Sequence, residues 1–258
     1  MKNLYRRLFG RLYWVQYSKE LSYKGEWKHG SFHGEGHLKY ANGNTFTGSF
    51  KSGTKNGFGH YKTSNGFEYI GDWLNGYQTG FGAICYKNGD LYEGDVQNGL
   101  RHGEGRFFQA SDCVWYKGAW IQGILYGHVK ISCSEWIFEG QIPQKDVISL
   151  GKLTYPDGSK YEGQILNFKR HGKGTLTAAS GEQTCGVWKD QLYVTNAIRT
   201  DAEGIIWKGS FKNSQPDGFM RIRMPNGHGY DGVWEKGDMV RVLSVINKTK
   251  SPNHYVVH

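Results

Sequence analysis

Glycine recurs in this sequence with a nearly constant period of about 23 residues. The segment "YKGEW" places Gly25 between two aromatic residues, and equivalent glycines follow at steps of 22 to 24 residues. These glycines are Gly48, Gly71, Gly94, Gly118, Gly140, Gly163, Gly186, Gly209 and Gly232. A period held through most of a chain indicates a repeat architecture, in which each unit packs mainly against its neighbours.

A second glycine follows most of these positions and predicts a turn. It occurs 18 residues later in most units, at Gly43, Gly66, Gly89, Gly158, Gly181, Gly204 and Gly227, and Asn or Asp often precedes it. Asn-Gly between alternating segments predicts a type I′ hairpin turn, because that turn needs positive φ at both central residues. We place the other turn at His33-Gly34, in "HGEG". Each unit is therefore predicted to run strand, turn, strand, turn.

The alternation of side chains predicts two different faces. The face that carries the repeat glycines, called the aromatic face, includes Tyr23, Gly25, Trp27, Gly36, Leu38 and Tyr40 in the first unit. The opposite face of that unit is charged, with Lys24, Glu26, Lys28, Glu35, His37 and Lys39. A period of two is that of a β-strand. A ring from a neighbouring strand can lie over a glycine, which offsets the usual weakness of glycine in strands.

These features predict an all-β fold. Ten units imply about twenty strands, and the aromatic content of 15% argues against a disordered chain. We expect an elongated, single-layer, twisted antiparallel sheet of consecutive 23-residue β-hairpins. A leucine-rich repeat would need an L-x-x-L-x-L pattern, and a β-propeller would need about 40 residues per blade.

The repeats resemble the MORN repeat (membrane occupation and recognition nexus), whose pattern is close to Y-x-G-x-W-x-x-G-x-x-H-G-x-G. "YKGEWKHGSFHGEG" at residues 23–36 and "YEGDVQNGLRHGEG" at residues 92–105 match it closely. The resemblance covers about residues 13–238, or about ten units. It implies the β-hairpin fold and a place in cilia, flagella, cytoskeletal structures or membrane junctions, without selecting among them.

The ends of the chain differ from the array. We assign residues 1–12 to an N-terminal basic amphipathic cap, residues 13–238 to the repeats, and residues 239–258 to a capping strand with a flexible tail. The N-terminal residues predicted to contact a membrane or a partner are Arg6, Arg7, Leu8, Phe9 and Arg11. A basic amphipathic segment can bind an anionic membrane, cap the open array or act as a presequence, and these alternatives stay open.

Charge and motifs argue against several classes of function. The net charge is +9, but residues 31–238 contain 22 basic and 21 acidic residues, so the repeats lack the basic face that nucleic-acid binding requires. "GHGYDG" at residues 227–232 fits a dinucleotide fingerprint, yet its glycines are turn and strand glycines of the last unit. We predict no enzyme activity, no cofactor and no metal site.

We predict a non-enzymatic scaffold that binds a protein partner through an aromatic trough. The partner is expected to be a helical or extended segment, and the rings predicted to bind it are Tyr23, Trp27, Tyr69, Trp73, Tyr92, Tyr116 and Trp120. We expect the binding surface in the first five units. Peripheral binding to anionic phospholipid and a regulatory module of a larger enzyme are the alternatives, and a homodimer is left open. The predicted location is the cytoplasm, at the cytoskeleton, a cilium or a membrane surface.

Overall fold

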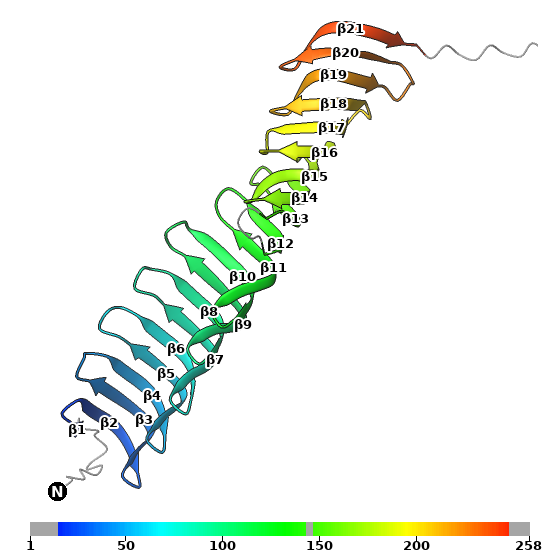
Figure 1. Cartoon of the computed structure of the whole chain (residues 1–258). Helices are drawn as coiled ribbons and strands as arrows, with labels where there is room; N and C mark the ends of the chain where they lie inside the picture. Colours follow the sequence, from blue (N-terminus) through cyan, green and yellow to red (C-terminus); the bar gives the residue numbers. More distant parts are fainter. Residues whose placement is uncertain (1–14, 143–146, 248–258) are drawn as a thin grey trace, which may run out of the picture. The chain divides into compact units, whose positions relative to one another are not determined.

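The computed structural model of the chain describes residues 15–142 and 147–247. All regular structure in this part of the chain is β-strand. The chain divides into two compact units, unit 1 (Met1–Cys133) and unit 2 (Ser134–His258), and each is described by itself. Figure 1 shows the strands of each unit following one another in chain order.

The strands have the lengths expected of hairpin repeats. Unit 1 contains β1 (Val15–Ser18), β2 (Leu21–Lys28), β3 (Ser31–Tyr40), β4 (Thr45–Lys51), β5 (Thr54–Lys62), β6 (Glu68–Leu74), β7 (Tyr77–Cys85), β8 (Leu91–Gln97), β9 (Leu100–Gln109), β10 (Val114–Ile121) and β11 (Ile124–Ser132). Unit 2 contains β12 (Ile137–Gln141), β13 (Ser149–Thr154), β14 (Lys160–Leu166), β15 (Lys169–Thr177), β16 (Gln183–Lys189), β17 (Tyr193–Thr200), β18 (Ile206–Lys212), β19 (Gln215–Arg223), β20 (Gly229–Glu235) and β21 (Asp238–Ile246).

Within each unit every strand pairs antiparallel with the next strand in the sequence. In unit 1 this order runs from β1 to β11. In unit 2 it runs from β12 to β21. The predicted all-β, single-layer array of consecutive hairpins is therefore confirmed.

The repeat glycines face one another across the strands and form a continuous row. In unit 1 each glycine of the row is the direct partner of the next, from β2 to β10: Gly25, Gly36, Gly48, Gly59, Gly71, Gly82, Gly94, Gly105 and Gly118. Five of these nine are the glycines on which the period was recognised, and the other four are the last glycines of "HGEG"-type motifs. The glycines on both strands of each hairpin thus have one explanation: they face one another in the same row of the sheet.

The glycine row is shorter in unit 2. Gly140, Gly151, Gly163 and Gly174 pair in sequence, and Gly174 pairs with Gly186. Beyond that strand larger residues share the row, because Ala197 pairs with Gly209 and Met220 pairs with both Gly209 and Gly232. The Met220 side chain occupies the space beside Gly209 that a ring fills elsewhere.

The tight turns lie four residues before the predicted position. Residues His29 and Gly30 have φ of 49° and 76°, as a two-residue type I′ turn requires, and they connect β2 to β3. Gly34, predicted to be in the turn, lies inside β3 with φ of 56°, at an irregularity of the pairing between Gly25 and Glu26. The first glycine of "HGEG" is therefore a β-bulge residue, and placing the turn at His33-Gly34 was wrong.

The Asn-Gly loops also differ from the prediction. In the loop between β3 and β4, Gly43 has φ of 84°, but Asn42 is not in the positive-φ region. The loop closes through a hydrogen bond from Gly43 N to the carbonyl of Tyr40 (3.0 Å) and one from Tyr40 N to the carbonyl of Asn44 (3.0 Å). Positive φ at one residue only excludes type I′, so the residue pair identified a loop but not its turn type.

Successive tight turns are hydrogen-bonded to one another along one edge of unit 1. From the second tight turn onward, the amide of the turn glycine donates to a carbonyl in the preceding hairpin: Gly53 to Phe32, Gly76 to Lys55, Gly99 to Gln78 and Gly123 to Arg101, at 2.8 to 3.1 Å. Turns usually project into solvent with these groups bonded to water. Here they continue the hydrogen bonding of the sheet beyond the ends of the strands.

The glycine row predicts a large effect of one methyl group. A Cβ at Gly82 would lie 2.5 Å from a ring carbon of Tyr69, so Gly82→Ala is expected to lower the free energy of unfolding by about 1–3 kcal/mol. Chemical denaturation followed by circular dichroism measures the change.

Gly76→Asn is the matched control, because nothing lies within 4 Å of a Cβ at Gly76, and asparagine tolerates its positive φ. An equal loss of stability in both variants would contradict the requirement for glycine in the row.

Candidate functional site

The rings of the aromatic face lie on pairs of row glycines. Tyr69 contacts the positions of Gly71 and Gly82, and its hydroxyl donates to the carbonyls of Asp72 (2.9 Å) and Thr79 (3.1 Å). The hydroxyls of Tyr23, Tyr92 and Tyr161 donate to the equivalent pairs of carbonyls. Each ring therefore joins the two strands of its hairpin and satisfies carbonyls at the bulge.

Three tryptophans each connect their hairpin to the one before it. The indole Nε1 of Trp73 donates to the carbonyl of Gly59 (3.3 Å), and Trp120 and Trp188 make the equivalent bonds to Gly105 and Gly174. A basic side chain from the preceding hairpin covers each of these indoles. The three pairs are Lys55 with Trp73 (4.5 Å to the ring centroid), Arg101 with Trp120 (4.3 Å) and Arg170 with Trp188 (4.8 Å).

The Lys55 ammonium group lies among four rings. Its Nζ is 4.5 Å from the ring centroids of Tyr61 and Trp73, 5.0 Å from that of Phe46 and 5.5 Å from that of Tyr40. Burial lowers the pKa of Lys55 to about 8. The rings attract the cation through their π faces, so this part of the aromatic face already holds a cation of its own.

Most of the rings predicted to bind a partner are buried within the sheet. Tyr23 and Tyr69 are fully buried, Tyr92 is 1% exposed, and Trp73 and Trp120 are 5% and 3% exposed. Their contacts are with glycines, with one another and with the basic side chains above.

Trp27 and Tyr116 are the two predicted rings that stay half-buried. Trp27 packs edge-on against Tyr23 and Phe32, and Tyr116 donates to Gln109 Oε1 (3.0 Å). Partner binding by the seven rings stays a prediction, and these two expose the most surface for it. The predicted N-terminal contacts, Arg6, Arg7, Leu8, Phe9 and Arg11, lie outside the described residues.

The acidic residue that follows many row glycines has a structural role. Asp72 Oδ2 accepts a hydrogen bond from the amide of Phe81 (3.2 Å), and Asp95 Oδ2 accepts one from Glu104 (3.0 Å). In unit 2 the amide oxygen of Gln164 accepts the equivalent bond from Lys173 (2.7 Å). A carboxylate or a neutral amide therefore serves equally to hold the backbone at the bulge.

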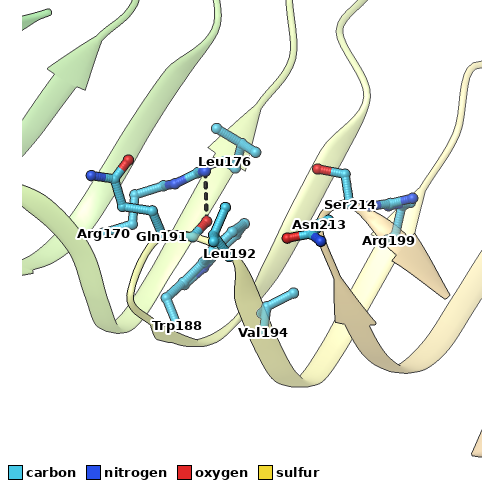
Figure 2. Close-up of a pocket in the computed structure, with 9 residues that line it drawn as sticks. All are labelled: Arg170, Leu176, Trp188, Gln191, Leu192, Val194, Arg199, Asn213 and Ser214. Atoms are coloured by element: carbon cyan, nitrogen blue, oxygen red, sulfur yellow. Dashed lines mark hydrogen bonds between the residues drawn. The ribbon is translucent and has the colours of Figure 1, made fainter. Parts of the chain in front are cut away.

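A small pocket in unit 2 contains two arginines. Figure 2 shows Arg170 and Arg199 on either side of Leu176, Leu192, Asn213 and Ser214. The Arg170 guanidinium donates to the carbonyl of Gln191 (2.6 Å), and Arg199 Nε lies 3.1 Å from Glu182 Oε1. Burial lowers the pKa of both arginines. Because the chain's own groups bind both guanidiniums, the pocket is explained by packing between adjacent turns.

The opposite face of unit 1 carries an exposed apolar patch. It consists of five residues on three neighbouring strands, called the apolar patch: Phe58 (61% exposed), Ile70 (38%), Leu74 (55%), Tyr77 (65%) and Phe81 (57%). Phe58 and Phe81 are at equivalent positions of successive repeats, between the bulge glycine and the row glycine. The charged face predicted from the first unit therefore does not continue through β5, β6 and β7.

The sequence contained a signal for this patch that was missed. The motif reads "GEG" in the first and fourth units but "GFG" at residues 57–59 and 80–82. A large apolar residue on the face away from the rings has no strand or helix to cover it in a single-layer sheet. Two phenylalanines at this repeat position therefore identify an exposed surface rather than a core.

Comparison with protein families identifies the repeats. The MORN repeat model matches residues 23–45, 46–67, 69–91, 92–114, 150–160 and 161–183. The chain is a MORN-repeat protein. In unit 1 the MORN matches span residues 23–114, which carry most of the glycine row and the whole apolar patch. The hairpins between residues 184 and 246 keep the fold without a MORN match, and there the glycine row contains Ala197 and Met220.

Two solved structures illustrate the more distant likenesses of the MORN-repeat chain. The TCP10 domain of Danio rerio CPAP, solved in complex with a peptide of Danio rerio STIL, is 12% identical, with a TM-score of 0.44, over 83% of this chain and 95% of that chain. The TCP10c domain of Drosophila melanogaster Sas-4 is 13% identical, with a TM-score of 0.31, over 78% of this chain and 93% of that chain. A search of curated protein sequences gave no significant match.

Among the described residues, no helix has the length and apolar character needed to cross a membrane. In the same residues, no group of three or more His, Cys, Asp or Glu side chains is arranged to hold a metal ion.

The buried tyrosines of the MORN repeats predict a loss of stability at alkaline pH. Burial raises the pKa of Tyr23 and Tyr92 to about 12, whereas tyrosine in an unfolded chain has a pKa of about 10. Between these values the folded state retains protons that the unfolded state releases, so the free energy of unfolding falls as pH rises. While the pH lies between these two pKa values, the loss is on the order of 1 kcal/mol per pH unit for each tyrosine.

Urea denaturation at pH 8 to 12 measures this dependence. The double variant Tyr23→Phe, Tyr92→Phe is expected to show a smaller slope above pH 10, and Phe46 already occupies the equivalent position in this chain. An unchanged slope would mean that other groups cause the alkaline loss.

Proposed function

We propose that this MORN-repeat protein is a non-enzymatic scaffold that binds a protein partner on the face of its sheet. The observation that carries the proposal is the apolar patch of Phe58, Ile70, Leu74, Tyr77 and Phe81, exposed on the face opposite the rings. Soluble proteins rarely leave such residues together in contact with water unless a partner covers them.

The patch has the properties of a binding surface on a rigid support. Its residues project from β5, β6 and β7, whose other face is fixed by Phe46, Tyr69, Trp73 and the glycine row. The backbone under the patch is therefore already fixed before a partner binds, and this limits the conformational entropy that binding costs. Exposed aromatic anchors on a preformed surface are the residues from which binding energy in protein interfaces mostly comes.

The main contact with the partner thus lies on the face opposite the aromatic trough that the sequence predicted. Rings that are 0–5% exposed, such as Tyr23, Tyr69 and Trp73, contact a partner only if the sheet rearranges. Trp27 and Tyr116, which are half-buried, provide a second contact area on the aromatic face. The assembly to which the scaffold belongs is cytoskeletal, ciliary or membrane-associated, as the repeats of the MORN family imply.

Peripheral membrane binding remains the alternative that the sequence raised. It depends on the basic residues in residues 1–12, and no observation on the described residues favours it. The same is true of a regulatory module of a larger enzyme.

Partner capture by matched phenylalanine variants tests the proposal. The tagged chain and its variants are expressed in cells that contain the endogenous protein, and captured proteins are quantified by mass spectrometry. We expect Phe58→Ser with Phe81→Ser to deplete specific partners at least about ten-fold, because each anchor contributes on the order of 1 kcal/mol or more.

Phe219→Ser is the control, since Phe219 is 48% exposed at the equivalent repeat position of unit 2. Trp27→Ala tests the aromatic face in the same experiment. Equal recovery of all partners by the wild type and the double variant, with unchanged circular dichroism, would overturn the proposal.

A further inference from the structure

Acidic and aromatic side chains alternate in one row across the apolar patch. Phe58 on β5 pairs directly with Asp72 on β6, and Phe81 on β7 pairs directly with Asp95 on β8. The amide of Phe81 is bonded to Asp72, and the amide of Glu104 on β9 is bonded to Asp95. The acidic–aromatic row is therefore Phe58, Asp72, Phe81, Asp95 and Glu104, on five consecutive strands.

The three carboxylates of this row form no ion pair among residues 15–142 and 147–247. Asp72, Asp95 and Glu104 are all exposed.

Three bases of the same face, on neighbouring positions, bind other acids. His60 and Lys62 bind Glu68, and Arg106 binds Glu93. The apolar patch is thus accompanied by uncompensated negative charge, which is complementary to a basic partner.

The spacing of the row fits a helix that crosses the strands. Neighbouring strands are about 4.8 Å apart, so Phe58 and Phe81 are about 10 Å apart with Asp72 midway. An α-helix rises about 1.5 Å per residue, which puts positions i and i+7 about 10 Å apart and i+3 or i+4 between them. A helix is about 10 Å wide with its side chains, so it also covers Leu74 and Tyr77 beside the row.

The hydrogen bonding of the partner's backbone favours a helix over an extended segment. An extended chain laid over the face of a sheet leaves its backbone N–H and C=O groups without partners where it is buried. A helix satisfies these groups internally and presents only side chains to the patch. The two apolar anchors and the intervening acid thus correspond to one face of one helix.

We propose that the acidic–aromatic row binds an amphipathic helix of the partner that carries apolar residues at i and i+7 and Lys or Arg at i+3 or i+4. The apolar residues pack on Phe58 and Phe81, and the basic residue reaches Asp72 between them. A second basic residue near i+11 meets Asp95 and Glu104. This inference rests on the proposed function, because it specifies the partner of the same patch.

A displayed peptide library tests the inference without knowledge of the natural partner. The probe is a phage library of 18-residue helical peptides, randomised at i, i+3, i+4, i+7 and i+11 and selected on the full chain. Counter-selection uses the double variant Phe58→Ser, Phe81→Ser. We expect enriched peptides to have apolar residues at i and i+7 and Lys or Arg between them.

Affinities of an enriched peptide for single variants separate charge from apolar contact. Asp72→Asn keeps an acceptor for the Phe81 amide, as Gln164 does in unit 2, while removing the charge. Fluorescence anisotropy should show about two- to five-fold weaker binding by Asp72→Asn at low salt, and the difference should disappear at high salt. Phe81→Ser should weaken binding about ten-fold or more.

Glu35→Gln is the matched control for net charge, because Glu35 occupies the position of Phe81 on β3, two repeats away, and should bind as the wild type does. Enriched peptides without a basic residue, or equal binding by Asp72→Asn, would overturn the helix proposal while leaving the apolar patch as a binding surface. No enrichment over the double variant would also overturn it. The proposed function is tested separately: it fails if the Phe58→Ser, Phe81→Ser chain captures natural partners as well as the wild type does.

Discussion

The contact of one ring with two facing glycine backbones is the interaction on which the repeat depends. A single-layer sheet has no second layer to exclude water, yet Tyr23 and Tyr69 are fully buried in it. They are buried because glycine leaves a depression on each of two adjacent strands, and the ring fills both. The hydroxyl then bonds carbonyls at the bulge, so one residue contributes apolar burial, cross-strand contact and hydrogen bonding.

The two faces of the sheet therefore have different roles: one stabilises the fold, and the other is exposed to solvent. The aromatic face is occupied by its own rings, indoles and basic side chains, and the Lys55 cation sits where a ligand's cation would. On the opposite face Asp72 and Asp95 hold the bulges, but the position between the bulge glycine and the row glycine has no such role and varies from repeat to repeat. Glutamate at position 35 and phenylalanine at positions 58 and 81 show that variation within one chain.

Sequence reasoning predicted the fold well because the period and the alternation are direct consequences of the geometry. It misplaced the turn because a glycine pattern reveals where positive φ is tolerated but not which glycine is in a turn and which is in a bulge. Gly30 and Gly34 both have positive φ, and only the backbone shows their different roles. It chose buried rings as candidate binding residues because an aromatic face without a covering layer is expected to be open. Phe58 and Phe81, in contrast, were predictable from the break in the "GEG" motif.

The hydrogen bonds between successive turns have a consequence for how such chains change length. Loops ordinarily accept inserted residues at little cost, since their ends are the only fixed points. In unit 1 the amides of Gly53, Gly76, Gly99 and Gly123 are each tied to the preceding hairpin. An extra residue in one turn breaks the bond on both sides and shifts a ring off its glycines. The array is therefore expected to change in length by whole hairpins. Insertions of single residues are expected only in the longer loops at the other edge of the sheet.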